Sequence, residues 1–86
     1  MTSFKDFVKL VQNTRDPALL EDFLLGVTTP HERKVLARRI EIVKRLLAGE
    51  AQQQIAQDLE VGVSTVTRGS RELNLGRFKI LRDKKK

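Results

Sequence analysis

The sequence predicts a small all-α protein that contains a helix-turn-helix, and three observations favour this fold class. Apolar residues recur every three or four positions along most of the chain, which is the spacing of a helical face. Helix-start signals, an Asp-Pro pair and a Thr-Pro pair, precede two of these stretches. The breaks between the stretches are short, as connections between helices usually are. Because 86 residues leave room for one domain, we expect five to six helices packed together.

Residues 1–26 predict two amphipathic helices. Ser3 is the expected cap of the first helix. Asp16 and Pro17 begin the second, and Gly26 is its expected end. The apolar faces comprise Phe4, Phe7, Val8, Val11, Leu19, Leu20, Phe23 and Leu24. A single chain of this size would struggle to cover so many large apolar side chains, so we interpret these residues as dimerisation helices. The alternative is an ordinary core within one monomer.

A long central helix is predicted over residues 29–48. Thr29 is its cap, and Pro30 suits the first helical position. Glu32 completes a capping box with Thr29, in which each residue's side chain accepts from the other's backbone amide. Gly49 follows the expected end of this helix.

Residues 52–73 have the spacing of a helix-turn-helix. Ile55, Ala56 and Leu59 share one face of a short helix, and Val66 on the next helix fills the angle between the two. Such a unit places the N-terminal end of its second helix in the major groove of DNA, where polar side chains read base edges. The N-terminus of its first helix is suited to phosphates. The candidate DNA-contacting residues are Gln52, Gln53, Val63, Ser64, Thr65 and Thr67. The alternative is a plain helical hairpin within a bundle.

Two positions depart from this pattern. Glu60 stands in the turn where Gly usually supplies a positive φ, and Gly62 comes two residues later. Either Glu60 adopts the left-handed conformation, or the turn has another shape. Gly69 lies inside a helical stretch, where Gly costs about 1 kcal/mol relative to Ala. It indicates close approach by a flat ligand or a neighbouring backbone, unless the helix simply tolerates it or ends there.

The net charge of +6 is unevenly placed along the chain. Residues 1–43 carry seven basic and six acidic side chains, whereas residues 44–86 carry ten and five. This excess therefore predicts that residues 77–86 form a basic tail, which is either a phosphate-contacting arm or a solvated end that aids solubility. Double-stranded DNA is the first partner to expect for such a chain, with acidic proteins as the alternative.

Several other classes of protein are disfavoured. Zero Cys removes disulfides, zinc fingers and thiol nucleophiles. The apolar runs are far shorter than the roughly 20 residues of a membrane span, and the N-terminus lacks a signal-peptide pattern, so we expect a cytoplasmic protein without a membrane partner. His31 is the only His and lacks partners for a metal site. No nucleophile–base set or phosphate-binding loop occurs, so we expect no enzyme, metal or cofactor.

Three motifs resemble those of the tryptophan repressor family. They are Thr67-Arg68-Gly69-Ser70 after the helix-turn-helix, Leu46-Leu47-Ala48-Gly49-Glu50 before it, and Thr29-Pro30-x-Glu32-Arg33 earlier. The likeness spans nearly the whole chain. It implies an intertwined all-helical homodimer that acts as a sequence-specific transcriptional repressor on a DNA operator. It also implies L-tryptophan as a corepressor, held between the central helix and the second helix of the helix-turn-helix.

The same resemblance implies a set of ligand-binding residues. Arg39 would hold the carboxylate of the amino acid, and Arg68 would lie flat on the indole as a cation–π contact. Gly69 would allow the ligand to approach, and Thr29 would help seat it from the partner chain. Glu72 stands where the family typically has Ser, and it would either pair with the ammonium of the ligand or repel the carboxylate.

Residues 1–76 are thus expected to form a single helical DNA-binding domain, followed by the basic tail 77–86. The segment before Gln52 is one residue shorter than usual in the family and lacks the usual Ser or Thr cap, and the chain after Leu73 is short. Two other functions remain open. One is a helix-turn-helix protein that binds DNA without a ligand, and the other is a helical protein-interaction module with a non-specific basic tail.

Overall fold

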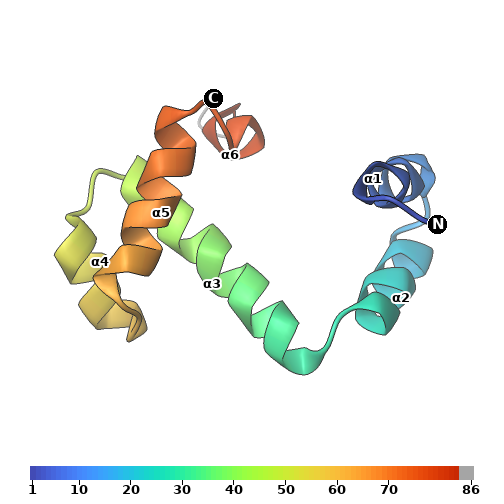
Figure 1. The fold of residues 1–86 in the computed structure, drawn as a ribbon, viewed down its shortest axis with the longest axis horizontal. Coiled ribbons are helices and arrows are strands. Elements are labelled where there is room, and N and C mark those ends of the chain that lie inside the picture. The colour runs from blue at the N-terminus through green and yellow to red at the C-terminus, as the bar shows by residue number, and fades with distance from the viewer. Residues whose placement is uncertain (84–86) are drawn as a thin grey trace. The chain divides into compact units, whose positions relative to one another are not determined.

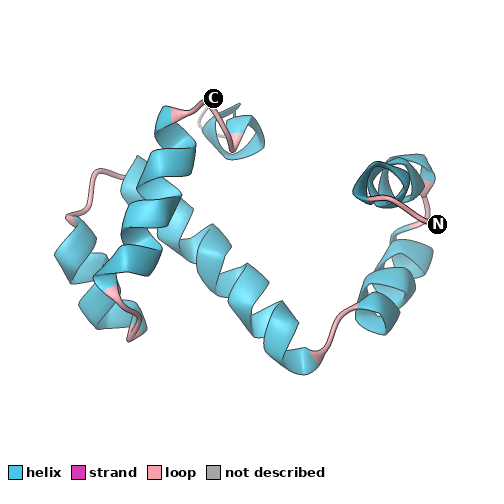
Figure 2. Cartoon of the chain, viewed as in Figure 1, coloured by secondary structure: helices cyan, strands magenta, loops and turns pink. Residues whose placement is uncertain are grey.

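The computed structural model describes residues 1–83, and all regular structure in that part of the chain is helical (Figures 1 and 2). The helices are α1 (Phe4–Asn13), α2 (Pro17–Val27), α3 (Pro30–Leu47), α4 (Gln52–Leu59), α5 (Val63–Asn74) and α6 (Lys79–Asp83). The all-α prediction with five to six helices is therefore confirmed. No helix among these residues is long and apolar enough to cross a membrane.

The chain divides into two compact units, residues 1–33 and the remainder from residue 34. In the first unit, Ser3 and Asp6 form a reciprocal capping box at the start of α1. The side chain of Asp16 accepts from the amide of Ala18 to cap α2, with Pro17 at the first helical position. The ring of Phe7 lies 5.8 Å from that of Phe4 and 5.9 Å from that of Phe23, measured between centroids. No residue of α1 or α2 is buried.

The predicted end of α2 at Gly26 is wrong by one residue. The helix continues to Val27, and Thr28 ends it in an extended conformation while donating its amide and its hydroxyl to the carbonyl of Leu24. Gly26 has no positive φ, so it does not supply the left-handed turn that makes Gly a helix stop. Gly49 does adopt φ +87° just after α3, as its place in the sequence indicated.

The second unit has a small apolar core where α4 and α5 meet α3. Ile42, Ile55, Ala56 and Val66 are buried in it, and Leu46, Leu59 and Val61 pack partly against them. The helix-turn-helix spacing predicts four core positions, and all four lie in or against this core: Ile55, Ala56, Leu59 and Val66. This packing sets α5 in a fixed orientation on the C-terminal half of α3 (Figure 1).

The turn between α4 and α5 resolves the question posed by Glu60. This residue adopts the left-handed conformation, with φ 56° and ψ 47°. The amide of Val61 then donates to the carbonyl of Ala56 at 3.0 Å, which closes the end of α4. A non-glycine residue therefore makes the turn usually assigned to Gly, at some conformational cost.

Gly69 lies on the face of α5 that packs against α3. A Cβ atom at this position would sit 3.3 Å from Cγ2 of Ile42 and 3.6 Å from Cδ1 of Leu46. The helix continues past Gly69 to Asn74, so it does not end there. The neighbours that approach Gly69 in this structure are the α3 side chains of Ile42, Leu46 and Val43.

Candidate nucleic-acid interface and adjoining pocket

The N-terminal half of α5 presents an exposed polar surface. Val63, Ser64, Thr65 and Thr67 are all exposed, while Val66 between them is fully buried. Gly62 precedes the helix and no side chain caps it, so the first-turn amides remain directed outward. A helix N-terminus of this kind attracts anions through these amides and the helix dipole.

Two of the predicted DNA-contacting residues are hydrogen-bonded to each other. The hydroxyl of Thr67 lies 2.8 Å from Oε1 of Gln52 and 3.0 Å from the carbonyl of Val63, so it donates toward both oxygens. This contact ties the N-terminus of α4 to the first turns of α5. Gln53 beside it is exposed. Gln52 and Gln53 thus lie at the N-terminus of α4, and Val63, Ser64, Thr65 and Thr67 lie in the first turns of α5.

A cluster centred on Arg45 holds α4 against the end of α3. The guanidinium of Arg45 donates to the carboxylates of Glu50 and Asp58, and the amide of Gln54 donates to the second oxygen of Asp58 at 2.7 Å. The hydrogen bond from Arg45, followed by that from Gln54, lowers the pKa of Asp58. Ala51 gives α4 no side-chain cap, so this cluster and the Thr67–Gln52 hydrogen bond supply polar contacts that hold the helix in place. Sequence spacing gave no signal for the cluster, since Arg45 and Asp58 are thirteen positions apart.

The local charge of the candidate interface is unexpected. Residues 52–67 contain no Lys or Arg, and their acidic residues are Asp58 and Glu60. Arg45 neutralises Asp58, which leaves Glu60 as the unpaired acid of this segment. In the predicted DNA complex, attraction to phosphates would therefore come from the helix N-termini and from basic residues outside the segment.

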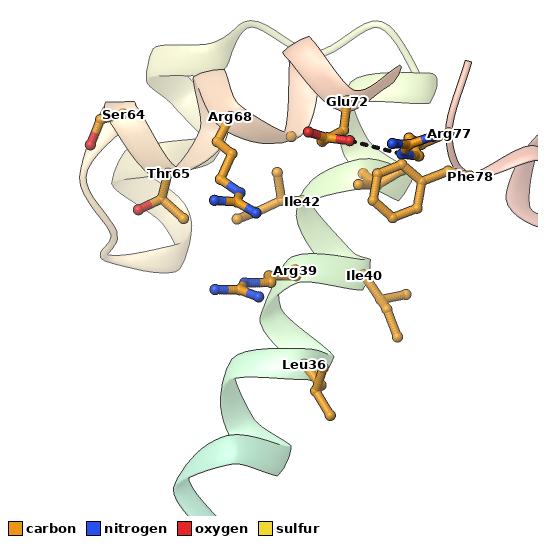
Figure 3. A pocket seen from close by; sticks show the side chains of 12 residues that line it. Leu36, Arg39, Ile40, Ile42, Ser64, Thr65, Arg68, Glu72, Arg77 and Phe78 are labelled. Atoms are coloured by element: carbon orange, nitrogen blue, oxygen red, sulfur yellow. Dashed lines mark hydrogen bonds and ion pairs between the residues drawn. The ribbon is translucent and has the colours of Figure 1, made fainter. Parts of the chain in front are cut away.

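A pocket of about 740 Å³ adjoins this surface between α3 and α5 (Figure 3). Its volume is in the range of sites that hold small organic ligands. From α3 it is lined by Leu36, Arg39, Ile40, Ile42 and Val43, from α5 by Ser64, Thr65, Arg68, Gly69 and Glu72, and beyond α5 by Arg77 and Phe78. Since Ser64 and Thr65 belong to both features, the pocket and the candidate interface share a wall.

The charged side chains of the pocket have a definite order. Figure 3 shows the guanidinium groups of Arg39 and Arg68 turned toward the same space from opposite helices. Neither forms an ion pair with an acid among the described residues. Further along α5, the carboxylate of Glu72 pairs with Nε of Arg77 at 3.2 Å. The pocket therefore offers two cationic groups at one place, a carboxylate at another, and an apolar floor.

Four of the five predicted ligand-binding residues line this pocket, namely Arg39, Arg68, Gly69 and Glu72. Thr29 does not line it. Its hydroxyl accepts from the amide of Glu32 at 3.1 Å, and its own amide donates to the Glu32 carboxylate at 2.8 Å. This is the predicted capping box of α3. A contact of Thr29 with a ligand from a partner chain stays a prediction.

Part of the pocket lies outside the predicted ligand-binding set. Leu36 lies three positions before Arg39 and four before Ile40, and this helical spacing is the available signal for their face of α3. Arg77 and Phe78 follow the left-handed Gly76, and Phe78 itself has φ 64°. Residues 79–83 of the predicted basic tail form α6, and Arg82 donates to the carbonyl of Leu73. Lys84, Lys85 and Lys86 lie outside the described residues.

Nothing in residues 1–83 resembles a metal centre, because no group of three or more acidic, His or Cys side chains is placed to hold an ion. His31 is exposed in the first turn of α3.

Comparison with known proteins identifies the family. The family described as Trp repressor protein matches residues 2–81. A Trp operon repressor homolog of Vibrio vulnificus strain YJ016 is 43% identical over 75 residues, which cover 86% of this chain and 74% of that protein. The homolog of Vibrio cholerae is 41% identical over 73 residues, with 84% and 71% covered, and that of Aliivibrio fischeri strain MJ11 is 40% identical over 73 residues, with 84% and 68% covered. The family is one of transcriptional repressors rather than enzymes. The chain therefore belongs to the Trp repressor family and is a regulator of that type.

Proposed function

We propose that this chain is a sequence-specific DNA-binding repressor that acts as a homodimer and is regulated by a tryptophan-like amino acid. The observation that carries the proposal is the shared wall of interface and pocket. Ser64 and Thr65 line the pocket and also lie at the exposed N-terminus of α5. A ligand bound in the pocket therefore contacts the same first turn of α5 that would meet the base edges.

The DNA part of the proposal rests on the helix-turn-helix. The buried contact of Ile55 and Val66 fixes α5 on α4, and the Thr67–Gln52 hydrogen bond aligns their N-termini. Short hydroxyl side chains at the tip of α5 donate to or accept from base edges, and the helix N-termini meet the flanking phosphates. Two copies then read half-sites about one helical turn apart.

The dimer part rests on uncovered apolar surface. The side chain of Phe4 is 77% exposed and that of Leu19 is 61% exposed, on two helices that bury no residue at all. Apolar faces of this extent mark an interaction surface. The N-terminal helices of a second copy, which carry the same apolar residues, are the proposed cover.

The ligand part rests on the pocket chemistry. Two guanidinium groups without acidic partners are suited to a carboxylate, and Arg68 also offers a flat face to an aromatic ring. Leu36, Ile40 and Phe78 supply apolar contact for the rest of such a ligand. L-tryptophan satisfies each of these requirements and is the proposed corepressor.

The decisive experiment selects DNA from a random duplex library with the purified protein, with and without L-tryptophan. We expect the selected duplexes to converge on a palindrome, and to do so more strongly with L-tryptophan present. Convergence without any effect of the amino acid supports a repressor that acts without a ligand. Absence of convergence in both arms contradicts the proposal and favours a non-specific basic module.

The selected palindrome then tests the reading residues. Thr65→Ala should reduce discrimination between the palindrome and a scrambled duplex by about 1–3 kcal/mol if that hydroxyl reads a base directly. The exposed Gln57→Ala on the far half of α4 is the control and should leave discrimination unchanged. Fluorescence anisotropy with both duplexes measures the difference, and equal discrimination by wild type and Thr65→Ala would remove direct readout at this position.

A further inference from the structure

The aromatic ring of Phe78 lines the pocket from an unusual backbone position. Phe78 has φ 64°, and a bulky side chain in this left-handed region has a conformational cost that Gly would not have. The apolar residues near it in the sequence, Leu75 and Ile80, are 66% and 75% exposed, whereas Phe78 is partly buried. Among residues 75–80, the apolar side chain that is sheltered from solvent is therefore the one with the strained backbone.

Backbone hydrogen bonds before Phe78 fix the turn that carries its ring. Gly76, with φ 93°, donates its amide to the carbonyl of Leu73 at 3.0 Å. The amide of Arg77 donates to the carbonyl of Glu72, also at 3.0 Å. A left-handed Gly with these two bonds is a Schellman motif, which ends α5 and reverses the course of the chain. The turn therefore directs the following residue back toward the pocket.

The chain after Phe78 is tied to α5 as well. The carbonyl of Phe78 accepts from the amide of Leu81 at 3.0 Å, at the start of α6. The guanidinium of Arg82 donates to the carbonyl of Leu73 at the end of α5. Phe78 is thus held on both sides by hydrogen bonds. A residue kept in a sparsely populated conformation by its surroundings points to a functional role for its side chain.

The Phe78 ring forms an apolar wall of the pocket. Figure 3 shows this ring apart from the guanidinium groups of Arg39 and Arg68, on the side where Ile40 also lies. With the ring in place, the pocket still has a volume of about 740 Å³, so the ring bounds the space rather than fills it. A ligand whose carboxylate meets the two arginines would therefore extend its side chain toward this wall.

An aromatic wall favours one kind of ligand side chain. Two aromatic rings that stack with an offset or meet edge to face attract each other beyond their apolar contact, and a saturated ring lacks this attraction. From the placement of this ring we propose that Phe78 is a specificity-determining residue of the ligand site, and that it makes the pocket prefer an aromatic amino acid over one with a saturated side chain. This inference rests on the proposed ligand site and adds the residue that selects the ligand's side chain.

The fluorescence of L-tryptophan tests the inference on the full chain. Because the protein contains no Trp and no Tyr, indole emission reports the ligand alone. L-phenylalanine and β-cyclohexyl-L-alanine, which share a carbon skeleton but differ in aromaticity, are then measured by displacement of L-tryptophan. Phe78→Leu should lower the affinity for L-tryptophan about two- to tenfold. It should also lower the ratio of the L-phenylalanine affinity to the β-cyclohexyl-L-alanine affinity, and this comparison of ratios cancels the contribution of Arg68.

Two further variants and one direct measurement serve as controls. Phe78→Tyr keeps the aromatic ring and should keep both the affinity and the ratio, with excitation at a wavelength that Tyr does not absorb. Ile80→Ala removes an exposed apolar side chain of α6 that does not line the pocket, and it should change neither quantity. In the wild type, nuclear Overhauser contacts should join the indole protons of bound L-tryptophan to the ring of Phe78, which needs no substitution at all.

Each other outcome overturns the inference. An unchanged affinity in Phe78→Leu, or missing Overhauser contacts in the wild type, removes the contact. Tighter binding by Phe78→Leu shows that the ring occupies the space of the ligand. Equal losses for both competitors, or a Phe78→Tyr protein that behaves like Phe78→Leu, leave no selectivity for aromatic rings. Absence of L-tryptophan binding to the wild type overturns the inference together with the proposed corepressor, while the DNA selection without ligand judges the repressor separately.

Discussion

Single residues decide how closely the helices of the second unit approach, and Gly69 is the clearest case. Its missing side chain leaves room for Ile42, which is 1% exposed. The same absence costs helix propensity, since Gly in a helix interior is about 1 kcal/mol less favourable than Ala. The structure accepts that cost in exchange for contact between α5 and α3. Packing against α3 is therefore sufficient to explain a glycine at position 69.

Substituting the two helical glycines separates propensity from packing. Gly26→Ala in α2 meets no atom within 4 Å and should raise the free energy of unfolding by about 0.5–1 kcal/mol. Gly69→Ala places its methyl group 3.3 Å from Ile42, and overpacking of this kind offsets the gain or reverses it. Denaturant unfolding at one fixed protein concentration measures both changes. Equal stabilisation by the two substitutions would show that α3 and α5 can move apart freely.

At the scale of elements, helix boundaries followed from local chemistry. The bounds of α4 match the prediction because Gln52 follows a break and Glu60 provides a left-handed end. The end of α2 was misplaced because Thr28, rather than Gly26, closes it through hydrogen bonds to Leu24. Capping signals within four residues are readable from a sequence. Gly26 and Thr28 can each end a helix, and which of them does so depends on the backbone conformation at Gly26, which the sequence alone does not specify.

Contacts between elements were much less predictable. The pairs Arg45–Asp58 and Thr67–Gln52 join residues 13 and 15 positions apart, and each depends on how two helices cross. Spacing along one helix says nothing about that crossing. The grouping of Arg39, Arg68, Gly69 and Glu72 was anticipated through the family resemblance. The far wall at Arg77 and Phe78 was missed, because it follows from two left-handed residues after α5.

The attachment of α4 should depend on pH through Asp58. Hydrogen bonds from Arg45 and Gln54 lower the pKa of this carboxyl in the folded chain, so its stabilisation is present above the unfolded pKa. It is lost as the pH falls through the folded pKa. The melting temperature of Asp58→Asn should therefore lie below that of the wild type at pH 7, and the two should converge toward pH 2. Asp22→Asn, at an exposed position on α2, is the control; a difference for Asp58→Asn that is constant with pH would contradict the charge-based account.

At the scale of the whole molecule, the 86-residue chain has a modest core for its apolar content. The buried apolar residues Ile42, Val43, Ile55, Ala56 and Val66 all belong to the second unit. The first unit buries no residue and exposes Phe4, Val8, Leu10, Leu19, Leu25 and Val27. Such a division is typical of a chain that completes its core with another copy. In the proposed repressor, two copies would also supply the two DNA-reading surfaces that a palindromic operator requires.

The mass of the protein in solution tests this division directly. Phe4→Asp places a charge on an exposed apolar position at the first residue of α1, where an acidic side chain is favourable to the helix itself. The helix should therefore persist while association weakens, and analytical ultracentrifugation should report a shift from about twice the chain mass of 9.8 kDa toward that mass. Gln12→Asp adds the same charge at an exposed polar position of α1 and should leave the wild-type mass unchanged. A wild type that sediments as a single chain would contradict the dimer, and a Phe4→Asp protein that keeps the wild-type mass would place the interface away from α1.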